Sequence, residues 1–306
     1  MIARAAHGNK LQVTDAAPQH EKILTLVAER LPAEFCRVAS PSLTFVEHVG
    51  HATFATLSRV RGLLSFVGEA LVNLGAIVKS PRKFRIKEFT SQLETVCIDA
   101  IPVCALVTGL IGVVVAYLFA SQMERYGASI FIVEAVGIAM VRELSPIIVA
   151  IIVAGRSGSA FTAQIGTMKL NEEVDAMRTL GLHPMHVLVF PRVMALVLAM
   201  PLLTFVGDVT GIVGGLLIAN GYLGITPATF MDRLQDMLAV RHVYVGLVKA
   251  PVFAVVIALI GCRMGLTVED NARSVGLHTT STVVQSIVAV ILLNAAFAIA
   301  LVELDI

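Results

Sequence analysis

The sequence is short of charge. Only 15% of its 306 residues are charged and 57% are hydrophobic, with a mean hydropathy of +0.84. Soluble globular proteins carry about 25% charged residues. This shortage excludes a surface that is exposed to water on all sides, so we expect an integral membrane protein.

Several motifs are also missing. No GxxxxGK[ST] run occurs, so the chain has no phosphate-binding loop and any ATP is bound by another polypeptide. The net charge is +1 and no basic face is visible, which excludes nucleic acid as a partner. Residues 1–22 contain no apolar core, so we expect no signal peptide there.

Metal and redox motifs are scarce as well. The four cysteines form no CxxC pair, and we expect buried thiols. His48 and His51 have a spacing seen in metal sites, as do His183 and His186. Pro184 interrupts the second pair and no acid lies at ligand spacing, so we expect no metal.

Long apolar runs dominate what is present. Residues 101–120 have no charge and are long enough to cross a hydrocarbon layer of about 30 Å. The same reasoning predicts an all-α protein with about five spans, the second bent at Pro146. The predicted spans are residues 98–120, 130–165, 193–219, 243–262 and 283–302.

The chain before the first span has two parts. Residues 1–50 form a polar extension that is too short to bury a core, and residues 51–306 form the membrane domain. Within 53–78, apolar residues recur every three or four positions, which favours an amphipathic helix lying in the membrane interface. A helix packed on a soluble core is the alternative.

Loop charges predict the orientation. Loops on one side carry eleven Lys and Arg residues, against three on the other. Cytoplasmic loops are enriched in these residues. We therefore expect the N-terminus and residues 171–180 in the cytoplasm, and the C-terminus outside.

A short polar helix is expected at residues 171–180, between the second and third spans. Asn171 is a good N-cap, and Gly181 and Pro184 end the helix. A helix this short is marginal alone, so it either docks on a partner or rests on the membrane. Its candidate contact residues include first-turn acids and a short apolar stripe: Asn171, Glu172, Glu173, Val174, Asp175, Met177, Arg178 and Leu180.

Some polar residues lie inside the predicted spans. Such groups are costly in lipid, so they should face protein or a watery cavity. They serve either a transport path or structural pairing, with Asn294 as an interhelical hydrogen-bond partner. These residues are Arg142, Glu143, Asp208, Lys249 and Asn294.

Small residues recur on two helix faces. Gly207, Gly211 and Gly215 share one face of the third span. Gly155 and Gly158 lie at the end of the second span, where residues 154, 158 and 162 share a face. Small residues allow close helix contact, either within the subunit or in a dimer.

Residues 155–158 read Gly-Arg-Ser-Gly, a GxSG pattern that is typical of rhomboid-type intramembrane proteases. A nucleophilic Ser157 would need a base within hydrogen-bond reach. None of the eight histidines lies in the middle of a span. An intramembrane serine hydrolase is therefore the alternative function.

The order of four segments carries a family resemblance. REL-P, AGR-GSA, GTM and EE-DA-RTLG follow one another between Arg142 and Leu203, and LVKAPVFAVVIALIGCRMGL and TTSTVVQSIVAV come later. Over Ser80 to Leu301 the chain resembles the MlaE/YrbE permeases, the membrane subunits of MCE-associated lipid ABC transporters.

The resemblance implies a homodimer in the bacterial inner membrane that moves phospholipid or a related lipid. It implies that residues 171–180 dock on a separate ATPase, which binds the ATP, and that the periplasmic side contacts an MCE-domain protein. The lipid cavity of the family lies at the dimer interface. Asn294 stands where some members carry an acid, which leaves a lysine–acid pair inside the membrane open.

Two further points follow from the family. Longer members carry a STAS-like domain before the interfacial helix, so residues 1–50 are either a truncated remnant of it or an unrelated extension. A scaffold that only anchors the ATPase is a third hypothesis, and it predicts no bound lipid. We expect the permease to bind no cofactor of its own and to have no catalytic residue.

Overall fold

The computed structural model describes residues 50, 53–54, 61–62, 65–66, 68–69, 72, 86–127 and 129–303. The chain divides into two compact units, Met1–Ser58 and Arg59–Ile306. Nearly all described residues belong to the second unit. The predicted polar extension therefore lies outside the described residues, apart from Gly50.

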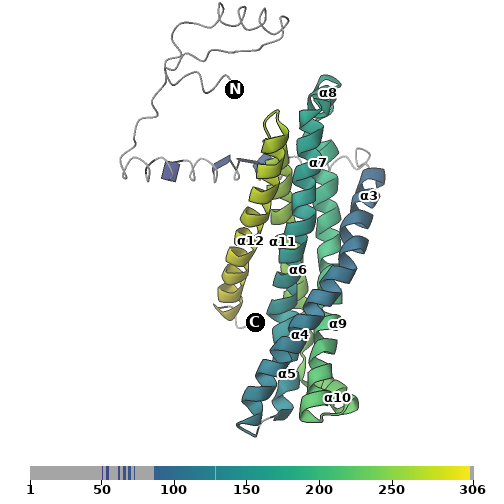
Figure 1. The fold of residues 1–306 in the computed structure, drawn as a ribbon, viewed down its shortest axis with the longest axis vertical. Coiled ribbons are helices and arrows are strands. Elements are labelled where there is room, and N and C mark those ends of the chain that lie inside the picture. Colours follow the sequence, from purple (N-terminus) through teal and green to yellow (C-terminus); the bar gives the residue numbers. More distant parts are fainter. Residues whose placement is uncertain are drawn as a thin grey trace, which may run out of the picture. The chain divides into compact units, whose positions relative to one another are not determined.

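The described part of the second unit is built from helices. Its long helices run roughly side by side, with α8 at one end and α10 at the other (Figure 1). The α-helices are α3 (Ile86–Cys97), α4 (Ile101–Glu124), α5 (Ile132–Ala139), α6 (Ser145–Val153), α7 (Ser159–Leu170), α8 (Glu173–Thr179), α9 (Phe190–Leu223), α10 (Pro227–Met237), α11 (Val240–Leu266) and α12 (Ala272–Glu303). Short 3-10 segments are η3 (Ile98–Ala100) and η4 (Ser129–Phe131).

Five continuous helical stretches are long and apolar enough to cross a membrane. They are Ile86–Glu124, Ile132–Leu170, Met185–Leu223, Val240–Leu266 and Ala272–Glu303. The prediction of an all-α membrane protein with five spans is confirmed. Apart from the start of the second stretch, every end lies beyond the predicted span, because helices continue into polar sequence that hydropathy does not count as membrane.

Three π-helical turns interrupt these stretches: η5 (Met140–Leu144), η6 (Ala154–Gly158) and η7 (Met185–Val189). Two of them, η5 and η7, end two residues before a proline, Pro146 and Pro191 respectively. Proline has no N–H to donate and its ring clashes with the carbonyl four residues earlier. A wider turn accommodates this defect, and π turns are frequent at functional sites.

Two clusters of buried side chains hold the helices together. The larger cluster joins α6, α9 and α11, with Val149, Leu203 and Phe253 fully buried. The smaller cluster joins α4, α5 and α10 at the opposite end from α8, around Ile132 and Phe230. These buried clusters therefore hold the first four spans, which α3 to α11 form, against one another.

The predicted interfacial helix, 53–78, is only partly described. Its described residues are helical, and Phe66 packs against the larger core cluster. Its remaining residues lie outside the described part of the chain. That the helix lies in the membrane interface stays a prediction.

Candidate functional site

The short helix α8 starts later than predicted. Asn171 is not its N-cap, because the Asn171 N–H still donates to the carbonyl of Thr167 (3.0 Å) and so ends α7. The chain then turns at Glu172, whose φ is +60°. The N-cap prediction was wrong because the preceding helix continues through the residue that local preference would have used as a cap.

The end of α8 is the one predicted from Gly181. Gly181 has φ +75° and its N–H donates to the carbonyl of Arg178 (3.0 Å). The N–H of Leu182 donates to the carbonyl of Met177 (2.9 Å). This pair of bonds is a Schellman motif, in which glycine adopts the left-handed conformation without strain.

The apolar stripe of α8 is buried against the rest of the chain at one end of the helix and exposed at the other. Val174 is 1% exposed and anchors the helix to its own chain, Met177 is half-buried, and Leu180 is 77% exposed. The acids of the first turn are exposed, and Asp175 is held by Arg178 at 2.9 Å. The helix therefore presents one large apolar side chain and several charges outward from a fixed base.

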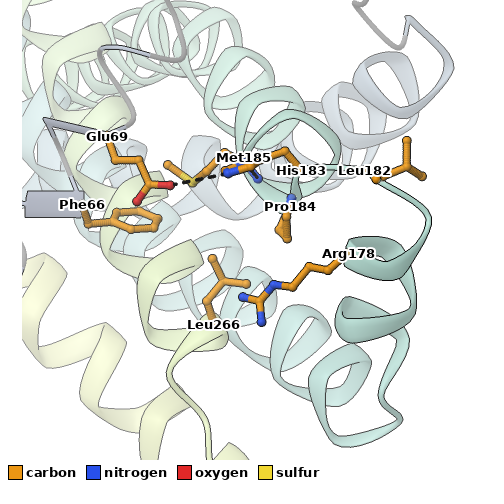
Figure 2. Close-up of a pocket in the computed structure, with 9 residues that line it drawn as sticks. Phe66, Glu69, Arg178, Leu182, His183, Pro184, Met185 and Leu266 are labelled. Atoms are coloured by element: carbon orange, nitrogen blue, oxygen red, sulfur yellow. Dashed lines mark hydrogen bonds and ion pairs between the residues drawn. The ribbon is translucent and has the colours of Figure 1, made fainter.

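A pocket of about 510 Å³ opens beside the base of α8 (Figure 2). His183 faces Glu69 at 4.0 Å, and its ring packs edge-on against His186. Arg178 extends from α8 toward Leu266 at the end of α11, as Figure 2 shows. The pocket thus joins α8, the predicted interfacial helix and α11 within the second unit.

The polar residues of the spans come together in one network. Lys249 is 1% exposed, and its Nζ donates to Oε1 of Glu143 (2.7 Å) and to the carbonyl of Arg142 (3.2 Å). The other carboxylate oxygen of Glu143 accepts from Nδ2 of Asn294 (3.3 Å). The lysine–acid pair that the sequence left open exists, with the acid supplied by η5 instead of α12.

The guanidinium of Arg142 completes this network. Its Nε lies 3.7 Å from Oε1 of Glu143, and a terminal nitrogen lies 3.5 Å from Nδ1 of His242. Sequence reasoning missed His242, although it lies two helical turns before Lys249 and so shares a face of α11 with it. The network joins η5, α11 and α12.

A second cavity, of about 260 Å³, lies against this network. Apolar side chains of α11 and α12 form its walls, including Val248 and Phe297. Lys249 contributes to its lining, and Arg241 and Tyr244 are the polar residues near the start of α11. An apolar hollow with a few cationic and hydrogen-bonding groups is suited to an amphiphilic molecule.

The predicted glycine face packs within the chain. A Cβ on Gly207 would lie 2.5 Å from Oγ of Ser145, and one on Gly215 would lie 2.7 Å from Val136. A Cβ on Gly211 would collide with Met140. The open alternative is thereby resolved, since this face of α9 contacts α5 to α6 and not a second copy.

The two glycines of the second span behave differently from each other. Gly158 approaches α11, where a Cβ on Gly261 would lie 2.7 Å from its carbonyl oxygen. Gly155 faces open space. Gly158 therefore allows close packing of the second and fourth spans, and Gly155 makes no such contact within the described chain.

Two polar side chains stand apart from the network. Asp208 is 4% exposed, and neither carboxylate oxygen has a hydrogen-bond partner among the described residues. Ser157 is 4% exposed, and no histidine is among the described residues that line the space beside it. A serine without a base is not activated for nucleophilic attack.

Only the second of the two predicted histidine pairs, His183 and His186, lies within the described residues. His48 and His51 lie outside the described residues. Across residues 86–127 and 129–303 and the shorter described pieces, no group of three or more His, Cys, Asp or Glu side chains has metal-binding geometry.

Comparison with known proteins gives consistent matches. A model of the family described as "Permease MlaE" matches residues 89–300. A Synechocystis protein named "Probable ABC transporter permease protein" is 37% identical over 66% of this chain and 77% of its own length. A Rickettsia typhi protein with the same description is 34% identical over 79% of this chain and 90% of its own.

A plant protein is also similar. The Arabidopsis thaliana protein named "TRIGALACTOSYLDIACYLGLYCEROL 1, chloroplastic" is 35% identical over 68% of this chain and 59% of its own length. Its name is that of a glycolipid.

Proposed function

Since the chain belongs to the MlaE permease family of ABC transporters, we propose that it forms the membrane path by which a phospholipid or related lipid leaves the inner membrane for the cell envelope. The observation that carries this proposal is the apolar cavity between α11 and α12, which lies against the Lys249–Glu143–Asn294 network. Acyl chains fit its walls, and Arg241 and Lys249 suit a polar, anionic headgroup.

A separate ATPase drives the movement in this proposal. The chain itself binds no ATP, and α8 docks on the ATPase from the cytoplasmic side. Leu180 is 77% exposed and fits a groove on such a partner, while Val174 fixes α8 to its own chain. A push on α8 is then passed to α7, which precedes it across the turn at Glu172, and on to η6, because η6 and α7 belong to one continuous helical stretch.

The proposed subunit acts as a homodimer, with an MCE-domain protein on the periplasmic side near α10. The outer face of α12 supports the dimer, because only 11% of its apolar window is buried within the chain, against 50% for α11. Large apolar side chains such as Leu292 and Ile299 are exposed there. The N-terminus lies in the cytoplasm and the C-terminus in the periplasm, as the loop charges indicate.

Cavity filling tests the lipid path. Val248→Trp places a large ring in the cavity, whereas Val252→Trp adds the same ring one turn along the same helix, outside the cavity lining. We expect native mass spectrometry of the purified complex to show less retained phospholipid for Val248→Trp only. Equal retention in both variants, or no phospholipid in the wild type, contradicts the proposed path.

Charge reversal tests the ATPase contact. Glu173→Lys with Asp175→Lys reverses two exposed acids on α8, and we expect the ATPase to be lost on co-purification while the permease still inserts. Glu269→Lys with Asp270→Lys makes the same change in the exposed loop between α11 and α12. Retention of the ATPase by the α8 variant, or its equal loss in the control, rules out docking through α8.

A further inference from the structure

A narrow crevice lies between α3 and the turn η6, away from both the cavity and α8. Its volume is about 100 Å³, the room of roughly three water molecules, which is enough for one small polar group. Its polar lining comes from both sides of the crevice: Gln92, Thr95, Arg156, Ser157 and Gln164.

Ser157 is the most unusual member of this lining. Its side chain is 4% exposed, yet its hydroxyl makes no hydrogen bond to any residue that the structure describes. Its oxygen is not among the fully buried side-chain atoms that have no partner, so it is open to the crevice that it lines. Since no base contacts it among the described residues, this hydroxyl is placed to donate to a bound ligand and not to act as a nucleophile.

The neighbouring side chains are fixed as donors. Arg156 donates to the carbonyl of Thr95 (3.3 Å) and pairs with Asp99 (3.2 Å), which uses two of its five N–H groups. The Gln164 oxygen accepts from Arg192 (3.2 Å), so its amide N–H groups remain to donate elsewhere. The crevice is therefore lined by hydrogen-bond donors whose side chains are held in place by residues outside it.

A second guanidinium, that of Arg192, lies close to the crevice and has no carboxylate partner among the described residues. Arg192 is 7% exposed, its Nε is buried without a hydrogen-bond partner, and it lies 5.9 Å from the ring centroid of Phe161. Among the described residues, no carboxylate lies within ion-pair distance of it. Arg156 is paired with Asp99, whereas Arg192, which reaches the crevice only through its hydrogen bond to Gln164, has no carboxylate partner in the described chain, so the positive charge near the crevice favours an anion.

The crevice lies at the depth of lipid headgroups. Asp99 comes just before the uncharged residues 101–120, and the next charged residue along this span is Glu124. The helix between these two acids is roughly 37 Å long at ~1.5 Å per residue, slightly more than a hydrocarbon layer of ~30 Å. Asp99 and its partner Arg156 therefore lie at the border of the apolar layer, on the side of α8.

We propose that this crevice binds the phosphate group of a phospholipid from the leaflet on the α8 side. The phosphate accepts hydrogen bonds from Ser157, Arg156 and Gln164, and its acyl chains extend along the apolar surface of α4. The proposal rests on the proposed function in that it makes this site the place where a phosphate-bearing lipid first contacts the permease.

Binding of short-chain phosphatidylglycerol to the full chain, purified in detergent, tests this site. We expect Ser157→Ala and Arg156→Gln each to weaken binding about tenfold, the usual effect of losing one hydrogen bond to a charged group. Ser286→Ala is the matched control, because Ser286 is also buried and without a partner but lies on α12. It should bind as the wild type does.

Two further ligands show which part of the lipid the crevice recognises. Diacylglycerol with the same chains lacks the phosphate and should bind weakly and equally to all variants. Because the proposal makes the phosphate the recognised group, inorganic phosphate at high concentration should compete with phosphatidylglycerol for the wild type, and a complete lack of competition counts against the proposal. Equal binding of the two lipids, or unchanged phosphatidylglycerol binding in both Ser157→Ala and Arg156→Gln, overturns it.

The test also separates this site from the proposed function. If Val248→Trp loses retained lipid while Ser157→Ala and Arg156→Gln do not weaken binding, the crevice proposal fails and the path survives. If the crevice variants weaken binding and Val248→Trp has no effect, the crevice is a lipid site and the proposed path through the α11–α12 cavity fails.

Discussion

Helices α4 and α9 approach each other backbone to backbone, whereas α11 and α12 meet through side chains. A Cβ on Gly112 would collide with the carbonyl of Gly211, and one on Gly214 with the carbonyl of Gly109. Between α11 and α12, by contrast, Phe253 and Phe297 meet edge to face at 6.2 Å. A cavity lies between the two helices, and Phe297 is part of its lining.

The difference shows which part of the subunit is able to move. A contact between two backbones has no rotamers to change, so a shift of α9 along α4 meets an immediate clash. Side chains around a cavity have alternative positions, and a change there is less costly. We infer that α4 and α9 form a fixed frame and that α11 and α12 form the adaptable side, where the proposed lipid path lies.

The largest effect is expected at the polar network of the adaptable side. Glu143→Ala leaves Lys249 buried without a carboxylate, which costs about 3 kcal/mol or more in comparable buried pairs. Thermal unfolding of the purified protein should show a marked loss of stability. Adding Lys249→Met should recover most of it, and a double variant as unstable as Glu143→Ala would mean that the pair is not the cause.

The fixed frame should be almost as sensitive to one methyl group. Gly112→Ala forces the backbones of α4 and α9 apart, and overpacking of this kind costs about 1–3 kcal/mol. Gly109→Ala is its control, since a Cβ there would lie 3.5 Å from the carbonyl of Thr210, an ordinary contact. Equal melting temperatures for the two variants would show that the frame yields more easily than we infer.

A smaller loss is expected from the side-chain hydrogen bond within the frame. The hydroxyls of Thr108 and Thr210 lie 2.7 Å apart. Hydrogen bonds between membrane helices contribute about 0.6 kcal/mol on average. Thr108→Val should therefore lower the unfolding free energy only slightly, and an effect as large as that of Gly112→Ala would show that the frame depends on polar contacts instead of shape.

The smallest effect is expected at Asp208, which lies in α9 without a hydrogen-bond partner among the described residues. Asp208→Asn removes a buried carboxylate that has no cation beside it, so stability should stay the same or rise. The comparison with Glu143→Ala, measured in the same unfolding assay, sharpens the contrast between the two buried acids. A large destabilisation by Asp208→Asn would reveal a partner for this carboxylate.

Much of this architecture follows from the sequence. The hydropathy of the chain is sufficient to predict five spans, and Gly181 alone indicates where α8 ends, because a left-handed residue there favours glycine. The five polar residues inside the predicted spans, Asp208 among them, were identified as a group that should face protein or a watery cavity. Burial cost alone supports that inference, whichever partners they find.

Which of these residues pair with one another could not be predicted from the sequence. Glu143 and Lys249 are 106 positions apart, and only the packing of η5 against α11 brings them to 2.7 Å. The start of α8 was wrong because α7 continues through Asn171, a competition between helices that local capping preference does not describe. The crevice at Ser157 was likewise hidden, since the GxSG pattern suggests a nucleophile until its surroundings are seen.

The length of the second span has a consequence of its own. The stretch Ile132–Leu170 has 39 residues, which at 1.5 Å per residue amounts to about 58 Å, nearly twice the thickness of a bilayer's oily interior. Roughly half of this rod must therefore project out of the lipid, and it carries α8 at its tip. In the proposed arrangement a partner bound at α8 therefore lies outside the hydrocarbon layer, and a tilt of α8 is passed along α7 to the part of the same stretch that lies inside it.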